Sequence, residues 1–130
     1  RDPTMENIIN SFNDVSASLR YKNGRYSLDA MHYLNEDFIP FTKKDLDRVM
    51  CGPRKLVFAS TRDMDMNTVT FFDCKTDITF KDVIDMIAES ETNIRKPHGK
   101  VWYEDHTFFE GGWLQESEKH GPVIMWCWGS

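Results

Sequence analysis

The segment with the clearest capacity for chemistry is 104–113, in which a histidine is flanked by carboxylates and aromatic side chains. A histidine beside Glu104 or Glu110 could transfer protons in general acid–base catalysis, which defines one candidate function, a small enzyme using His106. Aromatic residues are also enriched in the cores of protein–protein interfaces. We expect no catalytic residue and interpret the aromatic hairpin as a partner surface. This surface comprises Tyr103, His106, Phe108, Glu110 and Trp113.

A second candidate surface combines basic and aromatic residues, as proteins that bind single-stranded nucleic acids do. Its members are Arg95, Lys96, Lys100 and Trp102. No RNP motif or glycine-rich phosphate loop accompanies them. The formal net charge of −5 also disfavours general binding to phosphate backbones. Single-stranded nucleic-acid binding is therefore the alternative function.

Metal and nucleophile signatures are incomplete. Asp63 begins a run of alternating oxygen donors, but positions six and twelve of a calcium loop fall on Thr68 and Cys74. The histidines and cysteines lack the close pairs typical of zinc sites. The three cysteines lie far apart, which favours packing roles. We expect no metal ion and no cofactor.

The composition is that of a globular protein, with 130 residues, 40% of them hydrophobic and 13% aromatic. No signal-peptide pattern or long apolar run is present, which predicts a soluble protein of the cytoplasm or nucleus. Residues 1–4 precede Met5 and are interpreted as additions to the native chain. We expect a single α+β domain at 5–130, with a helical part at 5–51 and a sheet-and-helix part at 54–130.

The elements that must position these residues are organised around 55–91. Runs of β-branched and aromatic residues predict a hairpin over 55–74. Apolar residues then recur with helical spacing, which predicts a helix over 79–91. Thr79 and Asp82 form a capping-box pattern, and Ile78 can contact Val83 as a hydrophobic staple. The same pattern at Thr42 predicts a second capped helix that ends at 51–53.

The N-terminal third is predicted to be helical. An apolar stripe over 5–19 indicates an amphipathic helix, and 27–34 suggests a second, short helix. Asn23-Gly24 permits two interpretations, a helix C-cap or a type I′ hairpin turn over 19–28. We favour the C-cap, because the helical stripe continues almost to it.

The C-terminal third is predicted to contain strands. Gly111-Gly112 indicates a tight turn, giving a hairpin over 101–117. Residues 123–128 are apolar at every position, which is typical of a strand covered on both faces. We therefore place this strand in the middle of the sheet.

The order of elements from Lys55 to Ser130 is similar to the β-grasp architecture of ubiquitin-like folds, in which the last strand inserts beside the first. The expected fold is thus α+β, with N-terminal helices followed by a β-grasp-like mixed sheet packed on one helix. The chain ends Trp128-Gly129-Ser130, without the Gly-Gly tail of conjugated modifiers, so conjugation is not expected. The resemblance implies a recognition module. The predicted function is a small, intracellular, non-catalytic protein–protein interaction module.

Overall fold

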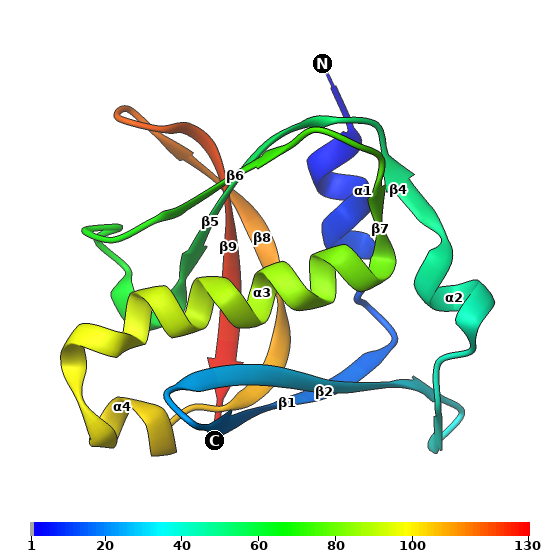
Figure 1. Cartoon of the computed structure of the whole chain (residues 1–130), viewed down its shortest axis with the longest axis horizontal. Helices are drawn as coiled ribbons and strands as arrows, with labels where there is room; N and C mark the ends of the chain where they lie inside the picture. Colours follow the sequence, from blue (N-terminus) through cyan, green and yellow to red (C-terminus); the bar gives the residue numbers. More distant parts are fainter. Residues whose placement is uncertain (1) are drawn as a thin grey trace.

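The computed structural model describes residues 2–130 and shows an α+β fold. Within these residues, seven strands form one mixed sheet in the order β3-β2-β1-β8-β9-β5-β6, and β4 and β7 form a second, two-stranded sheet. Figure 1 shows the long helix α3 crossing one face of the curved larger sheet. The strands are β1 Val15–Lys22, β2 Arg25–Leu34, β3 Asp37–Ile39, β4 Val49–Cys51, β5 Arg54–Ser60, β6 Thr70–Cys74, β7 Ile78–Thr79, β8 Phe108–Ser117 and β9 Gly121–Gly129. The α-helices are α1 Thr4–Asn10, α2 Lys43–Asp47, α3 Phe80–Arg95 and α4 Lys100–Glu104, and Thr61–Asp63 and Lys96–His98 are short 3₁₀ turns.

Helix α3 begins where its capping residues predict. The hydroxyl of Thr79 accepts a hydrogen bond from the Asp82 amide at 3.1 Å, and the Asp82 carboxylate accepts one from the Thr79 amide at 2.9 Å. This reciprocal pair satisfies two backbone donors that the first turn leaves free. The helix continues past residue 91 to Arg95, because its buried face extends through Ile94. The predicted start is confirmed, and the predicted end is four residues short.

Strand β9 lies in the interior of the sheet, as its apolar sequence predicts. It pairs with β8 antiparallel and with β5 parallel. Ile124 and Trp126 pack in the main core, which includes the buried side chains of α3. Val123 and Met125 face the other side, against the smaller cluster around Ala59. Both faces of the strand are therefore covered by protein.

The predicted N-terminal helices are wrong beyond residue 10. Residues 15–34 form the antiparallel hairpin β1–β2, in which Leu19 is opposite Leu28. Asn23 and Gly24 make the turn with φ of 53° and 79°, the positive values that a type I′ turn requires. Alternate side chains of β1 point into the core, among them Ala17 and Leu19. The segment therefore follows the two-residue period of a strand and not the 3.6-residue period of a helix. The hairpin alternative is correct, and the part at 5–51 is largely β.

Helix α2 confirms the second capping prediction but not its length. Thr42 and Asp45 form both hydrogen bonds of the capping box. The helix ends at Asp47, because Val49–Cys51 is extended and pairs with β7 as strand β4. A helix reaching residue 51 would remove this second sheet.

The hairpin predicted at 101–117 is also wrong. Residues 100–104 form the short helix α4, and β8 runs through Gly111-Gly112 without turning. The pairing of β8 with β9 shifts register between Phe109 and Gly112, which marks a β-bulge. A Cβ on Gly112 would lie 2.7 Å from the Met125 carbonyl oxygen. This glycine therefore permits a close approach of two strands, and the chain reverses later, at 118–120.

Candidate functional site: an aromatic groove between β1 and β8

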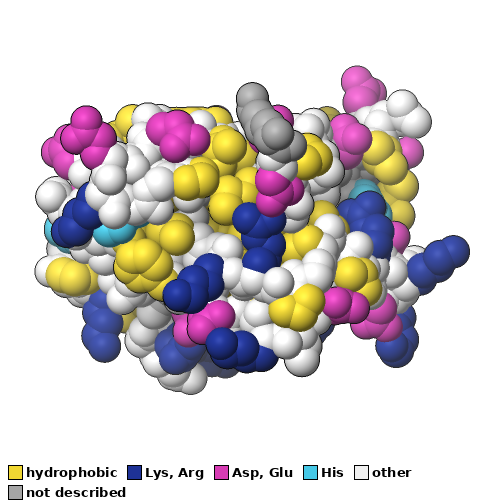
Figure 2. All heavy atoms as spheres, turned by 90° about the horizontal axis from the view of Figure 1, so that it is seen from above, with side chains coloured by type: hydrophobic (Ala, Val, Ile, Leu, Met, Phe, Trp, Pro, Cys, Tyr) yellow, Lys and Arg dark blue, Asp and Glu magenta, His cyan; other side chains and the backbone are white. Residues whose placement is uncertain are grey.

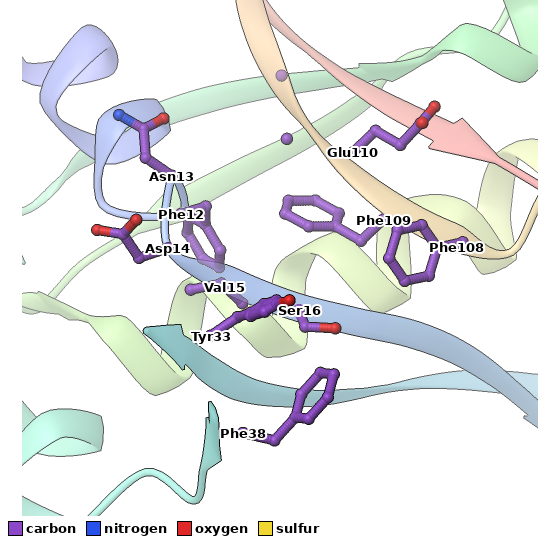
Figure 3. Close-up of a pocket in the computed structure, with 12 residues that line it drawn as sticks. Phe12, Asn13, Asp14, Val15, Ser16, Tyr33, Phe38, Phe108, Phe109 and Glu110 are labelled. Carbon is purple, nitrogen blue, oxygen red and sulfur yellow. The ribbon is translucent and has the colours of Figure 1, made fainter. Parts of the chain in front are cut away.

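A groove opens where β1 and β8 separate. The two strands share one ladder pair, Ser18 with Phe108, and a hydrogen bond from the Leu19 amide to the Thr107 carbonyl at 2.9 Å. Beyond this point lies a cavity of about 450 Å³, shown in Figure 3. It is lined by Phe12, Asn13, Asp14, Val15, Ser16, Tyr33, Phe38, Phe108, Phe109, Glu110, Gly111 and Gly112. We call this feature the β1–β8 groove.

Aromatic rings form both the floor and the walls of the groove. Phe12 and Phe109 are buried and pack edge to face, with ring centroids 5.7 Å apart. Tyr33, Phe38 and Phe108 are 40%, 60% and 45% exposed. Rings of this size normally lose most of their exposure in a folded core. The three wall residues thus present apolar surface to solvent around a preformed hollow.

The hairpin β2–β3 positions two of these rings. Tyr33 and Phe38 are opposite each other in the β2–β3 ladder, and their rings stack with centroids 4.9 Å apart. Asn35 and Glu36 make the turn with φ of 52° and 69°. The short turn fixes the register, which places both rings on the same face of the sheet.

The charged groups lining the groove are Asp14 and Glu110, both acidic. Among the described residues, neither carboxylate has a Lys, Arg or His nitrogen within 4.0 Å. The Glu110 carboxylate lies beside Gly129 and 3.9 Å from Cys127 Sγ. Burial raises the pKa of the Cys127 thiol, and the nearby negative charge of Glu110 raises it further. The groove therefore has a negative local charge.

The structure divides the predicted partner surface. Phe108 and Glu110 line the β1–β8 groove. Trp113 lies further along β8, opposite Met125, and its indole donates a hydrogen bond to the Gln115 side chain at 3.1 Å. Tyr103 belongs to α4. Its ring stacks on Tyr21 at 4.2 Å, and its hydroxyl donates to the Lys96 carbonyl at 3.0 Å.

The expected pairing of His106 with Glu104 or Glu110 is not formed. The carboxylate beside His106 is that of Asp105, with Oδ1 at 2.6 Å from Nδ1. Glu104 is paired with Lys100 on α4 at 3.6 Å, and Glu110 lies in the groove. His106 has a φ of 50°, and its carbonyl accepts a hydrogen bond from Arg95. These contacts hold His106 within the loop between α4 and β8, away from Glu104 and Glu110.

Arg95 cannot belong to the predicted nucleic-acid surface, because its side chain is completely buried. The Trp102 ring is already in contact with two side chains, His98 at 3.6 Å and the Arg62 guanidinium at 4.8 Å. A base would have to displace one of them to stack there. On the face shown in Figure 2, basic side chains lie among acidic and hydrophobic ones, without a broad basic region.

Among the groove residues that the sequence did not identify are Asp14, Tyr33 and Phe38. The predicted helices at 5–19 and 27–34 exclude Asp14 and Tyr33 from any strand. The signal that could have identified Tyr33 was the Asn23-Gly24 turn, because a hairpin there predicts which side chains share a face of β2. Phe38 lies outside every helix and strand that the sequence predicts.

Two further observations concern other classes of site. Within residues 2–130, no three His, Cys, Asp or Glu side chains gather closely enough to hold a metal ion. Across the same residues, no helix has the length and apolar character needed to cross a membrane. In comparisons with protein-family models, curated proteins and solved structures, no match to this chain was found.

Proposed function

We propose that this chain is a small, non-catalytic α+β module that binds another protein through the β1–β8 groove. The observation that carries the proposal is the set of exposed rings, Tyr33, Phe38 and Phe108, around a preformed hollow with an aromatic floor. Aromatic side chains supply much of the binding energy of protein interfaces when they enter or line such pockets.

The backbone around the groove suits an extended segment of the partner. Strand β1 pairs with β2 along its whole length, but with β8 at Ser18 alone among the described residues. Residues 15–17 therefore have no ladder partner on the side facing β8. An extended peptide placed there could add backbone hydrogen bonds, while the aromatic walls would accommodate its side chains.

We also propose that residues 54–130 have a β-grasp-like arrangement. The strand order β8-β9-β5-β6, the parallel β5–β9 pair and the position of α3 across the sheet support it. Strands β1 to β3 extend this arrangement beyond β8 and supply one wall of the groove. The groove thus lies at the junction of the two parts.

The test is selection of displayed random peptides on the purified protein, followed by affinity measurements with the selected peptides. We expect peptides whose affinity falls at least about tenfold for Phe108→Ala and for Phe38→Ala, the loss typical of an interface hot spot. Phe71→Ala is the matched control, because Phe71 is 63% exposed on the opposite edge strand, β6. Selected peptides that bind all three variants like the unmodified protein would refute the groove as the contact.

The nucleic-acid alternative is tested with a single-stranded oligonucleotide in low salt. Binding that weakens steeply with added salt, and that Phe108→Ala leaves unchanged, would replace the protein-binding proposal. We expect no such binding, because Arg95 is buried and the Trp102 ring is already stacked.

A further inference from the structure

We infer that the β1–β8 groove selects a positively charged side chain of its partner, a lysine or an arginine, which is attracted by the exposed rings and by the negative charge of Asp14 and Glu110. This inference rests on the proposed function, since it specifies the chemistry of the segment that the groove binds. The occupant is thus a basic segment of another protein.

The charges of the groove favour a cation over other occupants. Its lining contains two carboxylates, Asp14 and Glu110, and no lysine, arginine or histidine. Neither carboxylate is neutralised by an ion pair among the described residues. An acidic or phosphorylated segment would be repelled by this negative charge, whereas an ammonium or guanidinium group would be attracted to it.

The rings add a second attraction for a cation. A positive charge within about 6 Å of an aromatic centroid is attracted to the ring face. Elsewhere in this chain, arginines already occupy such positions, with Arg95 at 5.5 Å from the Tyr26 and Trp128 rings and Arg48 at 5.2 Å from Phe80.

The groove rings are open to the same interaction. Within residues 2–130, no arginine or lysine lies over Tyr33, Phe38 or Phe108. All three rings are substantially exposed, so they can accept a cation from outside the chain. Figure 3 shows these rings between Asp14, at one end of the groove, and Glu110, which lies toward β9 at the other end.

The shape of the groove suits a long basic side chain. Lysine and arginine have apolar stems that can pack on aromatic walls while the charged end reaches a carboxylate. A cavity of about 450 Å³ has room for one such side chain and part of the flanking backbone.

The first test uses two small probes of similar shape, tetramethylammonium, which is charged, and tert-butanol, which is neutral. Binding is followed by NMR through the backbone amides of Asp14, Ser16, Phe108 and Gly111, with sodium chloride added to equalise ionic strength. We expect saturable shifts with tetramethylammonium, and affinity for tert-butanol at least about fivefold weaker. Equal responses to the two probes, or no response at these amides, would overturn the inference.

Matched variants then separate the two sources of attraction. Asp14→Asn and Glu110→Gln should each weaken tetramethylammonium binding about threefold, while Glu118→Gln, an equal charge change at the β8–β9 turn, should not. Phe38→Leu keeps apolar area but removes the ring, and should weaken binding about two- to fivefold. Phe71→Leu is its control. Groove and control variants that behave alike would contradict the inference.

The selected peptides distinguish failure of this inference from failure of the proposed function. Replacing the critical lysine or arginine of a peptide by norleucine should weaken binding at least about tenfold. Peptides that bind the groove equally well with norleucine would leave protein binding intact and overturn the preference for a cation. If selection yields no peptide sensitive to Phe108→Ala, the proposed function fails, and the small-probe result still decides the charge preference.

Discussion

Substituting Arg95 by methionine should destabilise the protein strongly, because this guanidinium connects α3 to the loop that precedes β8. Its Nε donates to the Glu91 carboxylate at 2.9 Å, and Nη1 donates to the carbonyls of Trp102 and Asp105 at 3.0 and 2.9 Å. Nη2 donates to the His106 carbonyl at 2.7 Å. Arg95 and Glu91 are both completely buried. Methionine fills a similar volume but donates none of these bonds.

The magnitude follows from the Glu91 carboxylate that is left behind. Removing one partner of a buried ion pair costs about 3–5 kcal/mol, because the other charge stays buried without compensation. The Ser60 hydroxyl, at 2.8 Å, and the Trp128 indole would remain beside Glu91, but neither carries a positive charge. Replacing both residues by methionine should cost less than Arg95→Met alone, since no charge then remains to be buried.

The pH dependence of the variant gives a second signature. Burial raises the pKa of Glu91 above its ordinary value of 4.5, and the charge of Arg95 acts against this rise. Without Arg95 the pKa of Glu91 should rise further. A carboxyl group with a raised folded-state pKa binds its proton more tightly in the folded state, so stability is lost as pH increases through that pKa. The cost of Arg95→Met should therefore be larger at neutral pH than near pH 4.

Urea denaturation followed by tryptophan fluorescence measures the effect. With an m-value of about 2 kcal/mol/M, a loss of 4 kcal/mol lowers the midpoint by about 2 M. Arg20→Met is the matched control, because Arg20 makes an exposed ion pair with Asp29 at 3.7 Å. It should change stability by no more than about 0.5 kcal/mol. If Arg95→Met costs as little as Arg20→Met, the structural role assigned to the buried pair is incorrect.

Three further substitutions test the caps and the bulge. Thr79→Ala should destabilise the protein by about 1 kcal/mol, measured by urea denaturation, because the first turn of α3 loses a side-chain acceptor. Gly112→Ala should lower the thermal midpoint, because its Cβ would lie 2.8 Å from Trp126 Cε3 and 2.7 Å from a backbone oxygen. Hydrogen bonds with the Thr42 amide and the His32 ring lower the pKa of the Asp45 carboxyl from 3.8 to about 2. The stability that the Asp45 carboxylate contributes should therefore be lost as pH falls from about 4 to about 2. Asp45→Asn should flatten the acid limb of the stability profile over that range.

Each substitution has a control with a contrasting outcome. Thr79→Ser keeps the hydroxyl and should retain most of the stability. Gly52→Ala places its Cβ 4.0 Å from the nearest atom and should be tolerated. Asp65→Asn removes an equal charge from a loop outside any cap and should alter the stability profile less than Asp45→Asn does. Variants that match their controls would show that the contacts of Thr79, Gly112 and Asp45 contribute little to stability.

The parts of the fold that could be predicted from sequence are those set by neighbouring residues. The Thr42 and Thr79 caps were identified correctly, because a capping box depends on side chains three positions apart. The position of β9 was also correct, since a run of apolar residues on both faces can be accommodated only inside a sheet. Hairpin β5–β6 and helix α3 were likewise predicted.

The N-terminal hairpin shows where local patterns are ambiguous. Ile8, Phe12, Val15 and Leu19 fit a helical stripe, although the segment from Val15 is a strand. Val15 and Leu19 are four positions apart, a spacing that puts two residues on one face of either a helix or a strand. The strand conformation is stabilised by tertiary contacts, because β8 pairs with β1 and α3 packs against β2. The groove residue Tyr33 was missed for this reason.

Residues a few positions apart are thus enough to predict where the capped helices start and which strand is covered on both faces. The burial of Arg95 and the close strand packing at Gly112 follow only from how the elements come together in three dimensions. The same packing brings Asp14, Phe38 and Phe108 together from distant parts of the chain. The physical reason is that burial and proximity depend on how whole elements pack, whereas capping and alternation depend on residues a few positions apart.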